Sequence, residues 1–207
     1  MDAAQMMRQI ESAVADEQRS HRLRSLLAQV AQANGRRPTR KELDDAVQFV
    51  IDYIKHVPLL MMAMHAAAQQ LKVQAAVQPL LDGCEQYWFA GIDLIPDHHG
   101  LLGYMDDAYY VLSILQEIAE RYRQPNGEPL MNMRLRPSNQ TMRGLIGEPH
   151  ASILDAAVGQ AVAGPSFSAM LQNLPYMGRP LVDRDPIWGN ASIDEIVNAR
   201  MGALGIV

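Results

Sequence analysis

The first third of the chain has apolar residues at the spacing of amphipathic helices. Residues 3–33 contain no Gly or Pro, and their apolar positions recur every three or four residues, which predicts one long helix. Asn34-Gly35 is a typical helix end. Thr39 and Glu42 have the spacing of a capping box, so a second helix is expected to begin directly after Thr39.

The middle of the chain continues in helices that contain prolines. The second helix carries an apolar stripe as far as Val57, and Pro58 then removes a backbone donor, which predicts a kink or short break before the helix resumes. Further helices are expected over residues 73–89 and 104–122. The apolar stripe of the last one consists of Met105, Ala108, Tyr109, Leu112, Leu115 and Ala119.

The pattern changes after residue 124, where Pro and Gly recur and helical periodicity survives only in short pieces. We expect such pieces at residues 151–163, 166–173 and 192–204. Ser192 opens the last one, because Glu195 stands at capping-box distance from it. No strand pattern is convincing, apart from a short extended piece at residues 130–135.

These patterns predict an all-α fold, a helical bundle of about four to five core helices with a partly helical C-terminal arm. The bundle is expected over residues 1–124, and the Pro/Gly-rich arm over residues 125–207. The arm would wrap the bundle or reach a neighbouring subunit, so a protein partner or a homo-oligomer is expected.

Composition narrows the class of protein. The hydrophobic fraction is 48%, and 13 methionines with 6% aromatic residues favour close helix packing. A net charge of -5 gives no support for phosphate-driven binding, so no nucleic-acid partner is expected. The only cysteine, Cys84, is expected to be a buried apolar residue. The start of the chain lacks a signal-peptide pattern, and we expect a cytoplasmic protein.

The charge is unevenly distributed, because residues 73–120 contain eight carboxylates and no Lys or Arg. Two histidines and four of these aspartates lie in residues 92–108, between apolar residues. Buried negative charge is costly unless a metal, a basic surface or a partner neutralises it. We call residues 92–108 the acidic turn.

The acidic turn resembles the signature of the YkvA-like proteins, a bacterial family of unknown function. The resemblance lies in Ile92-Asp93-Leu94-Ile95-Pro96-Asp97 followed by Gly103-Tyr104-Met105-Asp106-Asp107-Ala108. It implies a helix–turn–helix core over about residues 57–123 and no established activity. Family members usually have apolar residues where this chain has His98-His99-Gly100.

The aspartates of the acidic turn have two interpretations. As helix and turn caps they would accept backbone N–H bonds. As metal ligands they would join the histidines to hold a divalent ion such as Zn, Mn, Fe or Mg. The candidate ligands are Asp93, Asp97, His98, His99, Asp106 and Asp107.

Three functions are compatible with these patterns. The first is a non-enzymatic interaction or assembly protein whose acidic turn orders two core helices. The second is a metal-dependent enzyme that uses the Asp/His cluster. The third is a peripheral membrane protein attached through the apolar run at residues 57–68, which is shorter than the roughly 18 to 20 residues that a spanning helix needs.

Overall fold

A computed structural model of the chain describes residues 2–89, 97–164 and 171–206. Within these residues the fold is all-α, with eight α-helices, two short 3-10 helices and no strand. The predicted all-helical class is therefore confirmed.

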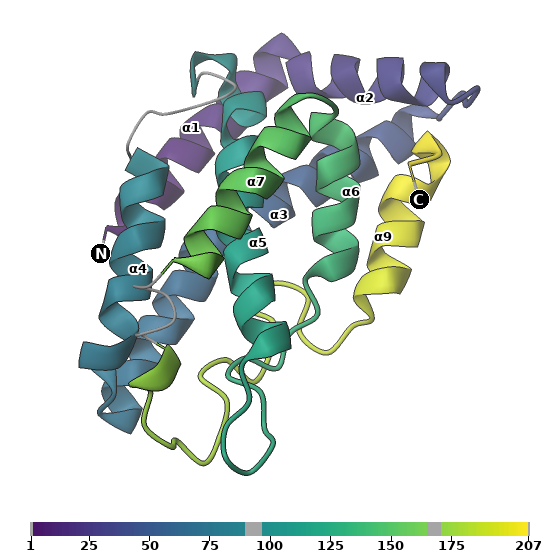
Figure 1. Cartoon of the computed structure of the whole chain (residues 1–207). Helices are drawn as coiled ribbons and strands as arrows, with labels where there is room; N and C mark the ends of the chain where they lie inside the picture. Colours follow the sequence, from purple (N-terminus) through teal and green to yellow (C-terminus); the bar gives the residue numbers. More distant parts are fainter. Residues whose placement is uncertain (1, 90–96, 165–170, 207) are drawn as a thin grey trace.

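The N-terminal half contains four α-helices (Figure 1). The helices are α1 (Ala3–Ser20), α2 (Arg22–Ala33), α3 (Arg40–Leu71) and α4 (Gln74–Phe89). The capping box of α3 is present as predicted: the Thr39 side chain accepts from the Glu42 backbone, and the Glu42 carboxylate accepts from Thr39 N. Pro58 lies inside α3 with its side chain buried, so the helix continues where a break was one of the expectations.

The single helix predicted over residues 3–33 is wrong, because the chain breaks between α1 and α2. His21 has a left-handed backbone with φ of 53°, although the segment contains no Gly or Pro. The carboxylate of Glu17 is buried and accepts hydrogen bonds from the backbone N–H of Leu23 at 2.9 Å and Arg24 at 3.0 Å. Glu17 therefore supplies the helix start that the local pattern does not show.

The second half of the chain begins with the short helix η1, which leads into the largely buried helix α5, and continues through shorter helices. The elements are η1 (Asp97–Leu102), α5 (Gly103–Arg121), α6 (Arg136–Ile146), α7 (His150–Ala163), α9 (Ile193–Met201) and η2 (Gly202–Leu204). Every residue of the predicted α5 stripe is buried. Val111, Ile114 and Ile118 are buried as well, so α5 is covered on several sides, as a central helix must be.

The helices after α5 pack on the same bundle as the helices before it. α6 and α7 contact α5, and α9 contacts α3 and α6, as the green and yellow ribbons of Figure 1 show. Leu135, Met142, Leu154 and Val197 belong to the hydrophobic cluster that also contains α3 and α5. Residues 125–206, where they are described, thus contribute to the common core.

Candidate functional site at the start of helix α5

The turn that leads into α5 packs against the junction of α1 and α2. η1 contacts both of these helices, and Leu101 is buried. Gly100 has φ of 70°, and a Cβ at this position would lie 3.5 Å from Oδ2 of Asp16 on α1. That distance is an ordinary van der Waals contact, so the backbone conformation, which only glycine takes at low cost, is what requires Gly100 in this turn.

Asp106 and Asp107 begin α5 from a fully enclosed position. Both residues are 0% exposed, and Asp106 lies in the first turn of the helix. Both are engaged by neighbouring groups. A carboxylate near a helix N-terminus is stabilised by the partial positive charge of the unpaired backbone N–H groups. The pair therefore occupies the part of α5 where burying negative charge costs least.

Two stacked aromatic pairs join the end of α4 to the first half of α5. Trp88 stacks on Tyr104 with 5.5 Å between ring centroids, and Tyr87 stacks on Tyr110 at 3.6 Å. The indole Nε1 of Trp88 also donates to the side chain of Gln9 on α1 at 3.1 Å. Sequence patterns did not indicate these pairs, although the aromatic residues stand on either side of the acidic turn. They fix the two helices that flank it.

The face of α5 that points toward α7 carries polar groups. The hydroxyl of Tyr109 donates to Oδ1 of Asp155 at 2.6 Å, and Nε of Arg143 donates to Oδ2 of the same carboxylate at 2.8 Å. Burial raises the pKa of the Tyr109 phenol, and the hydrogen bond and charge of Asp155 raise it further. Tyr109 is therefore a neutral donor at physiological pH.

A cleft of about 260 Å³ lies beside this network, between α5, α6 and α7. Its walls include Ser113, Gln116 and Asn139, while Val158 and Val162 provide apolar surface. The cleft also contains Arg121, Arg136 and Arg143, and each guanidinium forms an ion pair with a carboxylate. Its charges are thus balanced by the chain itself.

A second buried polar centre joins α3 to the loop before α9. His56 is buried, and its Nε2 lies 3.0 Å from Oδ1 of Asp185. Burial tends to raise the pKa of the Asp185 carboxyl, but the hydrogen bond and charge of His56 and the backbone N–H groups of Trp188 and Ile187 outweigh it. The pKa of Asp185 is consequently lower than its ordinary value of 3.8. Sequence patterns gave no signal for this pair.

The predicted metal ligands are only partly within the described residues. Asp93 and the side chains of Asp97 and His98 lie outside them. His99 is exposed, whereas Asp106 and Asp107 are enclosed. Within the described part of the chain, no group of three or more His, Cys, Asp or Glu residues has an arrangement suited to a metal ion. The six-residue ligand set therefore stays a prediction.

Cys84 and the apolar run of α3 lie in the core. Cys84 is buried, as predicted, and burial raises the pKa of its thiol to about 12. Among the described residues, α3 is the one helix long and apolar enough to cross a membrane, with mean hydropathy of 1.2 over its most apolar window. However, 61% of that window is buried inside the protein, so most of its apolar surface is used for packing.

A comparison with protein families finds a match that falls on this site. Residues 86–112 match the family described as a protein of unknown function, DUF1232. The matched segment contains both aromatic pairs, η1 and the buried aspartates of α5. No curated protein and no solved structure matches the chain. The matched segment is thus similar to a family without an assigned activity, and its role has to be argued from its geometry.

Proposed function

We propose that this chain is a non-enzymatic interaction or assembly protein, in which the YkvA-like segment orders the helical core. The observation that carries this proposal is the complete burial of Asp106 and Asp107. A catalytic carboxylate must reach the atom that it protonates, deprotonates or attacks. Side chains with no exposed surface, in a helix packed against α3, α4, α6 and α7, are better suited to stabilising the start of α5.

The surroundings of the pair support a structural role. η1 packs on α1 and α2, the aromatic pairs join α4 to α5, and Tyr109 connects α5 to α7. One short segment thus contacts helices from both halves of the chain. In a small bundle such contacts decide whether the helices share a single core, and the segment then presents the remaining surfaces in a defined arrangement.

The proposal is tested with Asp107→Asn, which keeps the shape of the side chain and removes its charge. A buried donor or acceptor that loses its hydrogen-bond partner costs about 1–3 kcal/mol of stability. We expect urea denaturation to show that the free energy of unfolding falls by an amount in this range, and that the decrease is the same in buffer and in buffer with EDTA. Asp82→Asn is the matched control, because Asp82 is exposed on α4 and is expected to unfold like the parent.

Elemental analysis of the purified protein separates this proposal from a metal-dependent enzyme. A stoichiometric divalent metal that is lost in Asp107→Asn, with no change in unfolding, would overturn the proposal. The same result would favour the metal-ligand interpretation of the acidic turn.

A further inference from the structure

The helix α5 is largely buried, yet one stripe along it is polar. Tyr109, Ser113 and Gln116 follow one another at the spacing that places side chains on one face of a helix. All three line the cleft between α5, α6 and α7. Polar side chains reduce the apolar surface that a core helix can bury, so packing alone does not account for this stripe.

The two helices that cover the stripe present polar or small residues to the same cleft. α6 contributes Asn139 and Arg143, and α7 contributes Asp155 and Gly159. Figure 1 shows α6 and α7 beside each other and against α5. Gly159 lies in the interior of α7, where glycine is less favourable than alanine. A Cβ there would meet no atom within 4 Å, so Gly159 leaves open space in the wall of the cleft.

The polar groups of the cleft have hydrogen-bonding capacity to spare. Each oxygen of Asp155 accepts one hydrogen bond, from Tyr109 or from Arg143, whereas a carboxylate offers about four acceptor sites. Arg143 donates from Nε and Nη2. Among the described residues, neither Nη1 of Arg143 nor Nε2 of Gln116 has a hydrogen-bond acceptor. An unused donor and an unused acceptor of opposite charge thus lie side by side.

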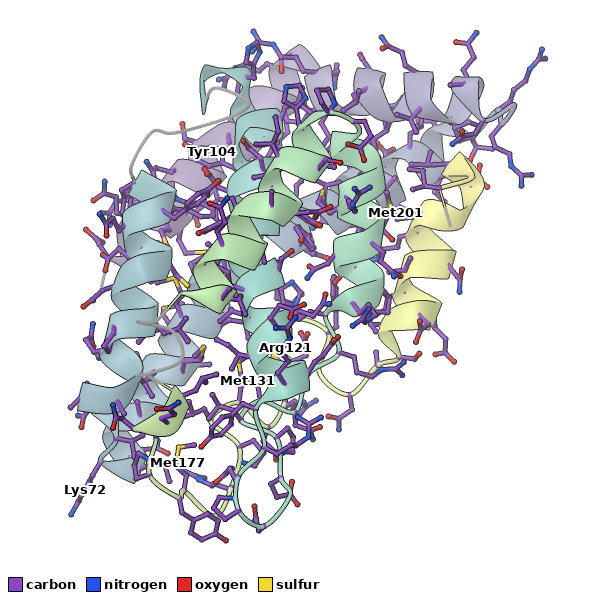
Figure 2. The ribbon with its side chains drawn as sticks, viewed as in Figure 1. Lys72, Tyr104, Arg121, Met131, Met177 and Met201 are labelled. Carbon is purple, nitrogen blue, oxygen red and sulfur yellow. The ribbon has the colours of Figure 1, made fainter. Side chains whose placement is uncertain are left out.

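The balance of charge in the cleft selects a class of ligand. Each of its three guanidinium groups forms an ion pair with a carboxylate of the chain; Figure 2 labels one of them, Arg121, at the lower end of α5. A ligand of one sign would compete for one member of such a pair and leave the other uncompensated, which is costly away from water. A ligand that carries both signs contacts both members, so a zwitterion is favoured.

The volume and the apolar wall of the cleft restrict the ligand further. At about 30 Å³ per molecule of liquid water, a cleft of about 260 Å³ has room for roughly nine non-hydrogen atoms. Val158 and Val162 lie one turn apart on α7 and form the apolar side of the cleft. An α-amino acid with a branched aliphatic side chain has this size, carries its two charges close together and offers methyl groups to the valines.

We propose that the cleft between α5, α6 and α7 binds a free α-amino acid with an aliphatic side chain. The carboxylate of the ligand accepts from Arg143, its ammonium group donates to Asp155, and its side chain lies against Val158 and Val162. A ligand that binds only the folded protein stabilises it, and this one contacts three core helices at once. The inference goes beyond the proposed function and does not depend on the acidic turn.

The test is a titration of the ¹⁵N-labelled protein with L-leucine, followed by NMR. The side-chain amide signals of Gln116 and Asn139 are expected to shift in a saturable manner, with a dissociation constant below about 1 mM. Two analogues each lack one charge: 4-methylpentanoate keeps the carboxylate, and 3-methylbutylamine keeps the ammonium group. Each analogue is expected to bind about tenfold more weakly than L-leucine.

Replacing Gly159 tests the location of the ligand. Gly159→Ala adds a methyl group to the wall of the cleft in a variant that stays folded, and it is expected to weaken L-leucine binding by about fivefold. Gly83→Ala is the matched control. Gly83 lies in α4, outside the cleft, and a Cβ there also meets no atom within 4 Å, so its binding curve should match the parent.

Replacing Asp155 tests the recognition of the ammonium group. Asp155→Asn removes the negative charge that the ammonium group contacts. This variant is expected to bind L-leucine about tenfold more weakly than the parent, whereas its affinity for 4-methylpentanoate should not fall, because that analogue has no ammonium group. The variant would therefore lose the preference for L-leucine over 4-methylpentanoate, a result that general damage to the cleft does not produce.

Four outcomes would overturn the inference. The first is no saturable shift at about 10 mM L-leucine, and the second is equal affinity for L-leucine and either analogue. The third is equal binding of L-leucine by Gly159→Ala and Gly83→Ala, and the fourth is tighter binding of a neutral sugar such as glucose. The Asp107→Asn unfolding experiment gives its result independently, because Asp107 is buried in α5 and does not line the cleft.

Discussion

The imidazole of His56 and the carboxylate of Asp185 are 129 positions apart in the chain, yet Nε2 lies 3.0 Å from Oδ1. The other ring nitrogen, Nδ1, donates to the carbonyl oxygen of Asp52 at 2.9 Å. The Trp188 ring covers the pair, with its centroid 4.2 Å from that of His56. This contact attaches the loop before α9 to the middle of α3.

Acid should release this attachment. The pKa of Asp185 is lower in the folded protein than its ordinary value of 3.8. The charged carboxylate therefore stabilises the fold at pH values above 3.8. The contribution is lost as the pH falls through the lower, folded-state pKa. Urea denaturation between pH 2.5 and 7 should show a smaller acid-dependent loss in Asp185→Asn than in the parent. Equal acid dependence in both proteins would show that Asp185 is not the group concerned.

Removing the carboxylate that caps α2 should destabilise the protein. Glu17→Ala leaves the N–H groups of Leu23 and Arg24 without their acceptor, and losing a cap costs roughly 0.5–2 kcal/mol. Glu17→Gln retains one oxygen acceptor, so its stability is expected to lie between that of Glu17→Ala and that of the parent. Urea denaturation measures the loss. Glu11→Ala, at an exposed position of α1, is the control, and a similar loss there would argue against the cap.

Two glycines should respond in opposite ways to replacement by alanine. Gly159 lies in α7, and a Cβ there would meet no atom within 4 Å, so Gly159→Ala is expected to stabilise the protein by about 0.5–1 kcal/mol. Gly100→Ala is expected to destabilise it by roughly 1–3 kcal/mol, because φ of 70° with ψ of -132° is a backbone conformation that residues with a Cβ rarely adopt. Thermal melting tests both predictions: the melting temperature should rise in Gly159→Ala and fall in Gly100→Ala. A lower melting temperature for Gly159→Ala would contradict the described geometry of α7.

The thiol of Cys84 should react slowly in the native protein. Burial removes it from reagents and raises its pKa to about 12, so very little of the reactive thiolate is present at pH 8. Reaction with a disulfide reagent such as DTNB is expected to require unfolding and to speed up strongly in denaturing urea. A native rate close to that of free glutathione would show that Cys84 is accessible.

Helix positions could be predicted where the signal is local. The Thr39–Glu42 capping box and the spacing of apolar residues in α5 depend on neighbours three or four positions away, and both are present as predicted. The break at His21 was missed because its cause is the Glu17 carboxylate, whose hydrogen bonds form only after the chain has turned. α6 was also missed, because Pro137 and a polar exposed face obscure its short apolar stripe.

The candidate site was predictable in part. The concentration of aspartates around Asp106 and Asp107 pointed to the start of α5, and the DUF1232 match falls on the same segment. Whether those carboxylates face solvent or the core depends on how α5 is covered by other helices. No pattern within residues 92–108 shows which helices cover α5, so both helix capping and metal binding were compatible with the sequence.

The amino-acid sequence by itself determined the all-helical class, the capped start of α3 and the apolar stripe of α5, because these follow from interactions within one or two helical turns. Only the tertiary structure decided which polar groups share a buried site. His56 meets Asp185, and Tyr109 meets Asp155, because distant helices pack side by side. It also decided that Asp106 and Asp107 are enclosed, since burial depends on the packing of the whole bundle.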